Sequence, residues 1–369
     1  MICYMEVTVS NLENIQLGHI VAQDIFANTK SPIISQNTVI RPVHLLILEA
    51  FQVKDVLIKE PESANEADED TNSSTPTAPP MTKKERYANV FERNYNHAIQ
   101  QIKKEFFNWE AGAHIDITKV RGFFLPLLDN ALQDRTVIYD LNSYSVPEDY
   151  IYHHCIATGL IAAVITQKLG YERGIIIQMG LAGLLADCGM AKVERRIRNK
   201  ASMLSESEFK EVQRHPYHSL NMIKLIPVLK DAMKLAIYQH HERLDGSGYP
   251  GGNKADSISK FAQIIAVSDV FHAMTSERLY RTRASTFKVV EMIRESEFGK
   301  FDMDVVQALI NVVADLPLNT QVELSNLEKA EVMFINQYAL TRPLVKVLNT
   351  GELLDLSQHR AIYINRVLK

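Results

Sequence analysis

The stretch from His240 to Pro250, HHERLDGSGYP, constrains the fold of this chain more than any other segment. Side chains on adjacent helical residues point about 100° apart, so two neighbouring histidines reach one centre only where a helix ends. The Asp-Gly-Ser-Gly that follows is typical of a turn, and the Tyr-Pro pair predicts an extended exit. We therefore expect a helix terminus that delivers two imidazoles into a cleft, with a surface histidine pair before a turn as the alternative.

The composition describes an ordinary folded protein of 369 residues, long enough for two or three domains. A net charge of −4 lacks the basic excess of nucleic-acid-binding proteins, so we expect neither DNA nor RNA as a partner. Cys3, Cys155 and Cys188 show no pairing motif, which predicts reduced thiols. The apolar runs are too short or interrupted to span a bilayer, so we expect a cytoplasmic protein with no membrane partner.

Composition and periodicity divide the chain into four parts. Residues 1–60 combine short β-rich runs with one helical pattern, which predicts a small α/β module. Residues 61–80 contain no large apolar side chain, which predicts a flexible linker over 61–81. Residues 82–315 are helical in pattern almost throughout, with 82–140 as leading helices, and 316–369 return to the alternation of a β-rich cap. The predicted fold class is mainly α, a helical bundle with a small α/β domain before it and a small β-rich cap after it.

Individual elements follow from the same periodicity. The expected strands are His19–Phe26, Pro32–Ile40, Lys54–Ile58, Val322–Leu324, Glu331–Phe334, Leu344–Leu348 and Ile362–Ile364. The expected helices are Val43–Phe51, Thr82–Trp109, Pro147–Leu169, Ser205–His215, Pro227–His241, Ile258–Ser276, Phe287–Ser296 and Met303–Asp315.

Side chains that can bind metal occur in the helical region at about one per helix. They are His154, Asp187, His215, His240, His241 and Asp269. The two carboxylates lie within apolar runs, where a charge is costly to bury unless it is paired or bound to a metal. Taken alone, His154 better fits a hydrogen-bonded core histidine, and each carboxylate fits a helix-end role equally well. Together the six residues predict a metal centre built from several helices.

These motifs resemble the HD-GYP branch of the HD-domain metal-dependent phosphohydrolases over about residues 140–315. The resemblance is carried by Asp149–His154, Leu184–Lys192, Arg214–Pro216, His240–Pro250 and Asp269–Arg281. It implies an HD-type helical bundle and the hydrolysis of cyclic di-GMP, a bacterial second messenger, to linear pGpG and onward to GMP. The terminal modules also resemble those of many such proteins, although more weakly.

The resemblance also implies the roles of individual residues. Asp187, the catalytic candidate, would bridge two divalent cations, with iron or manganese expected. One cation would be held by His154, Asp187 and Asp269, and the other by Asp187, His215, His240 and His241. Arg278 and Arg281 match positions that hold substrate phosphate, with solvated charges at a helix end as the alternative. Tyr249 is a further substrate-binding candidate, and its loop resembles the part implicated in contacts with partners such as diguanylate cyclase (GGDEF) domains; a homodimer is another candidate assembly.

The chain departs from the family at two positions in one short segment. The His-Asp pair of the family is Ala186-Asp187 here, and Met190 stands where the family has a lysine. One metal therefore loses an imidazole, so one or two metals per chain are expected. His272 stands where the family often has an acid, and no role is assigned to it. Three functions compete: an impaired cyclic di-GMP phosphodiesterase, an inactive protein that binds cyclic di-GMP or a cyclase, and, less favoured, a phosphohydrolase acting on another nucleotide. The first two are favoured almost equally, and we predict the impaired enzyme over the inactive protein by a small margin.

Overall fold

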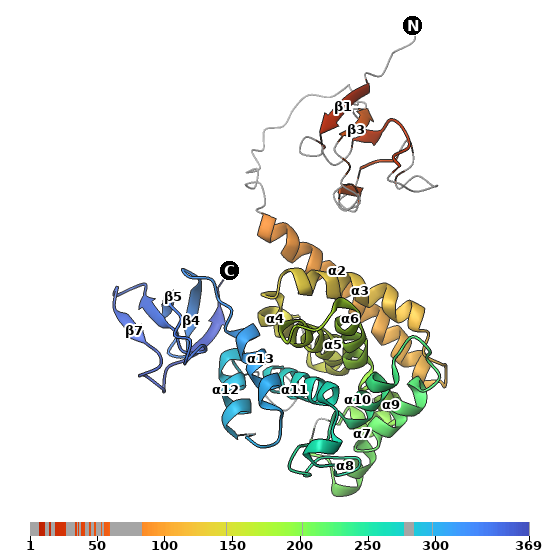
Figure 1. Cartoon of the computed structure of the whole chain (residues 1–369), viewed down its shortest axis with the longest axis vertical. Helices are drawn as coiled ribbons and strands as arrows, with labels where there is room; N and C mark the ends of the chain where they lie inside the picture. Colours follow the sequence, from red (N-terminus) through yellow and green to blue (C-terminus); the bar gives the residue numbers. More distant parts are fainter. Residues whose placement is uncertain are drawn as a thin grey trace, which may run out of the picture. The chain divides into compact units, whose positions relative to one another are not determined.

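The computed structural model describes residues 83–144, 146–200, 202–276, 284–296 and 298–368, together with parts of the segment 7–59. The chain divides into two compact units, Met1–Pro79 and Pro80–Lys369 (Figure 1). The linker predicted at 61–81 lies outside the described residues, and the four domain boundaries stay predictions.

The amino-terminal unit contains a three-stranded antiparallel sheet in the order β1-β3-β2. Its strands are β1 (Val7–Asn11), β2 (Ile20–Val21) and β3 (Asp55–Lys59). Alternate residues of β3, Val56 and Ile58, are buried and pack with Val21 and Leu48 in a small separate core. The strand predicted at 54–58 is therefore present, while β1 was not predicted from the sequence.

The second unit is mainly helical, as predicted, with a small sheet at its carboxyl end (Figure 1). The leading helices are α2 (Lys83–Glu110), α3 (Ile117–Gln133) and α4 (Val137–Asp140). The central helices are α5 (Tyr150–Lys168), α6 (Arg173–Leu185) and α11 (Lys260–Thr275). The remaining helices are α7 (Arg195–Arg198), α8 (Glu206–Val212), α9 (His215–Ile223), α10 (Asp231–Gln239), α12 (Thr286–Ser296) and α13 (Met303–Val313).

Helices α5, α6 and α11 form the centre of the bundle because they are apolar on nearly every side. Their backbones approach closely: a Cβ added to Gly183 would lie 2.9 Å from the Cα of Gly159, so only glycine allows this contact. Among the described residues, the segment 173–192 is long and apolar enough to span a membrane. However, 72% of its most apolar stretch is buried inside the protein, as expected for a core helix.

The carboxyl-terminal sheet has five strands in the order β7-β6-β5-β4-β8, all antiparallel. The strands are β4 (Gln321–Leu324), β5 (Lys329–Phe334), β6 (Leu344–Val347), β7 (Leu353–Asp355) and β8 (Ile364–Val367). Arg342 joins the sheet to α12 through two hydrogen bonds of 2.6 and 2.7 Å to the buried carboxylate of Glu291. The sheet is the predicted β-rich cap, with β7 as a strand that the sequence did not reveal.

Two predicted helix boundaries are wrong. Ser205 does open α8 with a capping box, but the helix predicted to run through His215 stops at Val212, and α9 begins at His215. Pro216, at the start of α9, lacks an amide N–H and its ring clashes with a preceding helical turn, so it begins a new helix. The helix predicted from Pro227 begins at Asp231, because the backbone of Lys230 directly before it is extended.

The carboxyl end of α2 is bound to the segment that follows α6. The ammonium of Lys192 donates to the backbone carbonyl of Trp109 at 2.6 Å. The Glu110 carboxylate accepts hydrogen bonds from both Arg195 and Arg198. Arg198 also donates to the carbonyl of Met190 at 3.1 Å, so α2 supports this segment through four polar side chains.

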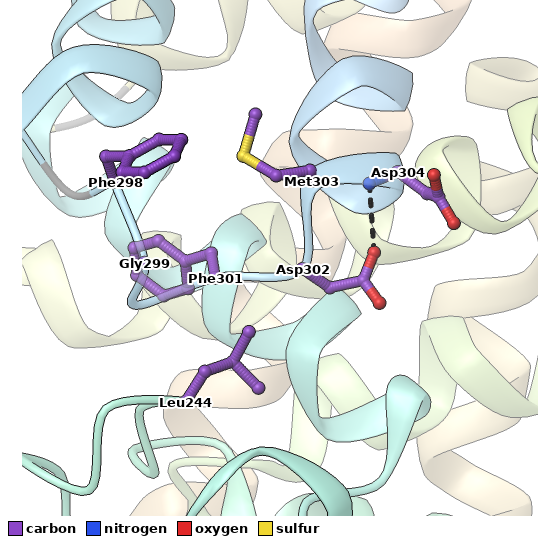
Figure 2. A pocket seen from close by; sticks show the side chains of 7 residues that line it. All are labelled: Leu244, Phe298, Gly299, Phe301, Asp302, Met303 and Asp304. Atoms are coloured by element: carbon purple, nitrogen blue, oxygen red, sulfur yellow. Dashed lines mark hydrogen bonds between the residues drawn. The ribbon is translucent and has the colours of Figure 1, made fainter.

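Figure 2 shows a pocket of about 400 Å³ near the start of α13. Its lining residues are Leu244, Phe298, Gly299, Phe301, Asp302, Met303 and Asp304. The Arg243 guanidinium lies over the Phe301 ring, 4.8 Å from its centre, so the pocket adjoins the loop that follows His241. None of the lining residues is a predicted metal ligand.

Candidate metal centre

The structure brings all six predicted metal ligands together. His154 comes from α5 and Asp269 from α11. Asp187 lies two residues after the end of α6, His215 begins α9, and the histidine pair follows α10. Their donor atoms fall into two groups, each with all atoms within 4.8 Å of one another. The four-residue group comprises Asp187, His215, His240 and His241. The three-residue group comprises His154, Asp187 and Asp269.

Asp187 belongs to both groups and turns a different oxygen to each. Its Oδ2 lies 3.2 Å from Nε2 of His154, on the side of the three-residue group. Its Oδ1 lies 3.0 Å from Nε2 of His215 and 3.5 Å from Nε2 of His240. This division of its oxygens suits a carboxylate that bridges two cations.

Two histidines of the four-residue group are oriented by hydrogen bonds to backbone carbonyls three residues earlier in the chain. Nδ1 of His215 lies 2.8 Å from the carbonyl of Val212, and Nδ1 of His240 lies 2.6 Å from the carbonyl of Ile237. A carbonyl only accepts, so each Nδ1 carries a proton, and Nε2, which faces Asp187, is the nitrogen that would bind a metal. A metal-binding histidine characteristically donates its other ring N–H in this way, so the donor set fits a divalent metal.

The histidine pair converges on the centre because α10 ends there, as the sequence predicts. The last helical residue is Gln239, and the rings of His240 and His241 lie 4.1 Å apart between centroids. The chain then folds back, so that the Tyr249 amide donates to the His241 carbonyl at 3.1 Å and the Tyr249 ring stacks on the His241 ring at 4.6 Å. A Cβ on Gly248 would lie 2.4 Å from that carbonyl, so glycine is required for the return.

Glu242 holds this loop closed and was not singled out in the sequence. Its side chain is fully buried and accepts hydrogen bonds from the backbone amides of Gly251 at 2.6 Å and Asn253 at 2.9 Å. A carboxylate that accepts two amide protons is satisfied without a metal. An acid three residues before the Asp-Gly turn is the sequence signal that points to this role.

The turn that carries Asp187 is held against α9 by Ser219. The Ser219 hydroxyl donates to the Ala186 carbonyl at 2.6 Å and accepts from the Gly189 amide at 2.8 Å. A Cβ on Gly189 would lie 2.2 Å from the carbonyl of His215. The position of Asp187 relative to His215 therefore depends on a glycine and a serine.

Charges within the cluster set the protonation of its members. Burial alone would lower the pKa of His154, but its hydrogen bonds to Asp187 and Asp269, together with their charges, raise it to about 9. Burial alone would raise the pKa of Asp187, but hydrogen bonds from His154, His215 and His240 lower it well below its ordinary value. Burial and then the charge of His240 lower the pKa of His241 well below the ordinary value. The cluster thus holds ionised carboxylate beside imidazole, the chemistry of a mixed nitrogen and oxygen metal site.

Three side chains form the accessible face of the cluster. His241, Asp187 and Asp269 keep 15%, 13% and 11% of their side-chain surface exposed, whereas His215 and His240 keep 3% and 1%. Solvent or a ligand therefore reaches the centre over these three residues.

Several other predicted features lie away from the centre. His153 turns to α2, where its Nδ1 is 3.2 Å from the Tyr95 hydroxyl, and burial lowers its pKa to about 4. Lys192 is bound to the Trp109 carbonyl and does not take the place of the missing lysine. Ala186 is buried and brings no donor to the three-residue group. Arg278 and Arg281, predicted to bind phosphate, lie outside the described residues.

The sequence did not assign a role to two residues that contact His154 behind the centre. The Tyr150 hydroxyl lies 3.1 Å and Nδ1 of His272 lies 2.9 Å from Nδ1 of His154. Tyr150 belongs to the same helix as His154, four residues earlier, so helical spacing could have revealed it. His272 lies one turn after Asp269 on α11, and only the packing of α5 against α11 brings it to His154.

The helical region is similar in sequence to known proteins. Residues 131–305 match the family model described as the HD domain. A cyclic di-GMP phosphodiesterase of Pseudomonas aeruginosa is 29% identical over 252 residues, which cover 68% of this chain and 61% of that protein. A cyclic di-GMP phosphodiesterase of Thermotoga maritima is 27% identical over 230 residues, covering 62% of this chain and 60% of that protein. A 3'3'-cGAMP-specific phosphodiesterase of Vibrio cholerae is 28% identical over 229 residues, covering 60% and 53%.

A solved structure of an HDG"Y"P protein from Bdellovibrio bacteriovorus aligns with 84% of this chain and 99% of its own, at 14% identity and a TM-score of 0.44. The chain spans between 53% and 61% of the length of the three curated relatives named above. The family match covers the residues that build both donor groups, and the HHERLDGSGYP element lies within it. Residues 131–305 are therefore similar to the HD-domain family.

Proposed function

We propose that this chain is a metal-dependent phosphodiesterase that hydrolyses cyclic di-GMP to pGpG and GMP, with a rate reduced by Ala186 and Met190. The observation that carries the proposal is the division of Asp187 between two donor groups, one oxygen to each. Two of the three curated relatives are named as cyclic di-GMP phosphodiesterases, which favours this substrate. The third is named for 3'3'-cGAMP, which makes a cyclic dinucleotide the common substrate class.

The residues of this chain would contribute orientation and charge. Divalent metal ions held by the two groups would activate water and offset the negative charge that develops on the phosphate. Asp187 holds its oxygens on both sides of the centre, and the accessible face over Asp269 and His241 receives the phosphodiester. Burial and then the charges of Asp269 and Asp187 raise the pKa of Tyr249, so its hydroxyl stays protonated and can donate a hydrogen bond to substrate.

The reduced rate follows from the donor count. The four-residue group offers three imidazoles and a carboxylate, whereas the three-residue group offers one imidazole and two carboxylates. Met190 has no cation to place near the phosphate, and the nearest lysine in sequence, Lys192, is bound to Trp109. The second metal therefore binds more weakly and the developing charge is less well offset.

Ala186 and Met190 also support an alternative function, which is binding without cleavage. An inactive protein would keep the four-residue group and the Tyr249 loop and would bind cyclic di-GMP or a diguanylate cyclase domain as a signalling module. Arg278 and Arg281 stay candidates for holding phosphate in either case. Iron or manganese as the metal, a cytoplasmic location and a homodimer complete the proposal.

Turnover measured by chromatography separates the two functions. The full chain is stripped with a chelator, reloaded with Mn²⁺ or Fe²⁺, and incubated with cyclic di-GMP and with 3'3'-cGAMP. We expect metal-dependent formation of pGpG that Asp187→Asn abolishes. Asp231→Asn is the matched control, because its side chain is 98% exposed on α10, and it should keep full activity. Tight binding of cyclic di-GMP with no product at any metal concentration would instead support the binding function.

A further inference from the structure

The two ring nitrogens of His154 face different surroundings. Nε2 lies 2.8 Å from Oδ1 of Asp269 and 3.2 Å from Oδ2 of Asp187, inside the three-residue group. Nδ1 faces away, 2.9 Å from Nδ1 of His272 and 3.1 Å from the hydroxyl of Tyr150. An imidazole binds a metal through a nitrogen that carries no proton, so ligation through Nε2 requires the proton on Nδ1. That proton then needs an acceptor behind the centre.

His272 is placed to be this acceptor because its other nitrogen is engaged. His272 is fully buried, and its Nε2 lies 3.1 Å from the hydroxyl of Ser276, while Nδ1 is more distant from that hydroxyl at 3.4 Å. The Ser276 hydroxyl donates its single proton to Oδ1 of Asn142 at 3.2 Å. It therefore accepts from Nε2–H of His272, which leaves Nδ1 of His272 with a lone pair towards His154.

We propose that His272 is a positioning residue that holds His154 in the Nδ1–H tautomer, with Nε2 free for the metal of the three-residue group. The hydrogen bonds run in one direction, from His154 through His272 and Ser276 to Asn142. Every acceptor along this line is buried or half-buried, so no solvent molecule is needed to complete it. The proposal rests on the proposed function, in which His154 is a metal ligand.

Tyr150 is the competing acceptor for the same proton. Its ring stacks on the His154 ring, with centroids 5.2 Å apart and planes tilted by 22°. The contact of His272 is shorter, and its Nδ1 in this tautomer can only accept, whereas a phenol hydroxyl both donates and accepts. We therefore assign the tautomer to His272 and orientation of the ring plane to Tyr150.

Three variants of the full chain separate these roles. His272→Leu removes the acceptor, and His272→Asn restores a carbonyl oxygen close to the position of Nδ1. Tyr150→Phe removes the competing hydroxyl and keeps the stacked ring. Mn²⁺ binding is titrated by electron paramagnetic resonance, and the weaker of two binding steps is assigned to the three-residue group by its loss in Asp269→Asn. We expect His272→Leu to weaken this step by about 10-fold to 100-fold, with His272→Asn and Tyr150→Phe close to the natural protein.

Nuclear magnetic resonance gives a readout that a merely structural role would not change. Protein with ¹⁵N-labelled histidine is loaded with Zn²⁺, which is diamagnetic, and the ring N–H of His154 is observed. The natural chain and His272→Asn should show a slowly exchanging proton on Nδ1, and His272→Leu should lose it. Circular dichroism of each variant confirms that the helices are intact.

The proposal is overturned if His272→Leu and His272→Asn weaken Mn²⁺ binding equally, if neither changes it, or if Tyr150→Phe has the larger effect. A natural chain without a second binding step would overturn it as well. Both readouts are made without substrate. The expected binding results in a protein that cleaves no cyclic dinucleotide would uphold the role of His272 and overturn the proposed function alone.

Discussion

The raised pKa of His154 makes the stability of the metal-free protein depend on pH in a defined window. An unfolded histidine has a pKa near 6.5, and the folded value is about 9. A group whose pKa is higher in the folded state stabilises that state while it is protonated, so the contribution is complete below 6.5 and is lost as the pH rises through 9. The full contribution is roughly 3 kcal/mol, of which roughly 2 kcal/mol is lost between about pH 7 and pH 8.5.

His153 and His241 contribute little to the change in stability between about pH 7 and pH 8.5. Burial lowers the pKa of His153 to about 4 and that of His241 well below its ordinary value, so above about pH 7 both are neutral in the folded protein and mostly neutral in the unfolded protein. Burial raises the pKa of Cys188 to about 12, so the unfolded state gains stability from thiol ionisation only towards higher pH. The variant His154→Gln carries the same thiols and provides the reference for this background.

Urea unfolding measures the effect through the single tryptophan of the chain, Trp109, which is fully buried in the helical unit. With chelator present, the free energy of unfolding of the natural chain should fall by roughly 2 kcal/mol more than that of His154→Gln between about pH 7 and pH 8.5. Added metal should remove the difference in slope, because a bound cation displaces the proton from Nε2. Equal slopes for the two chelated proteins would refute the ion pair between His154 and its two carboxylates.

Three further predictions concern the donor groups and the carboxyl-terminal sheet. Ala186→His with Met190→Lys should raise cyclic di-GMP hydrolysis at least tenfold, about 1.4 kcal/mol of barrier, and His241→Ala in that background should abolish it. Elemental analysis of protein at modest metal concentration should find nearer one metal than two per chain, because one group has four donors and the other three. Arg342→Ala should lower the free energy of unfolding, measured by circular dichroism in urea, by about 3 kcal/mol, because the buried Glu291 then keeps only the Thr341 hydroxyl at 2.9 Å and the Lys288 ammonium at 3.7 Å.

Each of these predictions has an outcome that contradicts it. A natural chain already as fast as the double variant would show that Ala186 and Met190 do not limit the rate. Two metals that resist chelation would show that the three-residue group gains a donor from elsewhere. Arg366→Ala is the control for the buried pair, because Arg366 is 58% exposed and its loss should cost at most about 1 kcal/mol. An equal loss of unfolding free energy in the two arginine variants would contradict the claim that burial makes the Arg342–Glu291 pair more important than an exposed pair.

Much of the centre could be predicted because its members break the apolar pattern around them. A histidine or carboxylate inside helices as apolar as α5 and α11 is costly unless it has a partner, so His154 and Asp269 stand out in the sequence. Adjacent histidines before a glycine-rich turn likewise predict a helix end, and α10 ends there. These signals are local, and periodicity is sufficient to read them.

The rest depends on contacts between distant parts of the chain. His272 meets His154 across 118 residues, and Ser219 fastens the Asp187 turn across about 30, so neither contact leaves a spacing pattern. The choice of oxygen that Asp187 turns to each group follows from how α9 packs on that turn. Strands β1 and β7 were missed for a related reason: each is a short edge strand whose pairing is set by its neighbour.

The attachment of α2 to the segment after Asp187 connects the metal centre to a helix that contributes none of its donor atoms. Helix α2 has 28 residues and at 1.5 Å per residue is about 42 Å long. Its first turn comes next in sequence after the amino-terminal unit, and its last turn grips Lys192, Arg195 and Arg198. Lys192→Met removes the hydrogen bond to Trp109, and the Met190 and Val193 amides should then exchange hydrogen faster. A ligand or protein that displaces α2 along its axis would therefore displace the segment directly after Asp187 without contacting any of the metal-binding side chains.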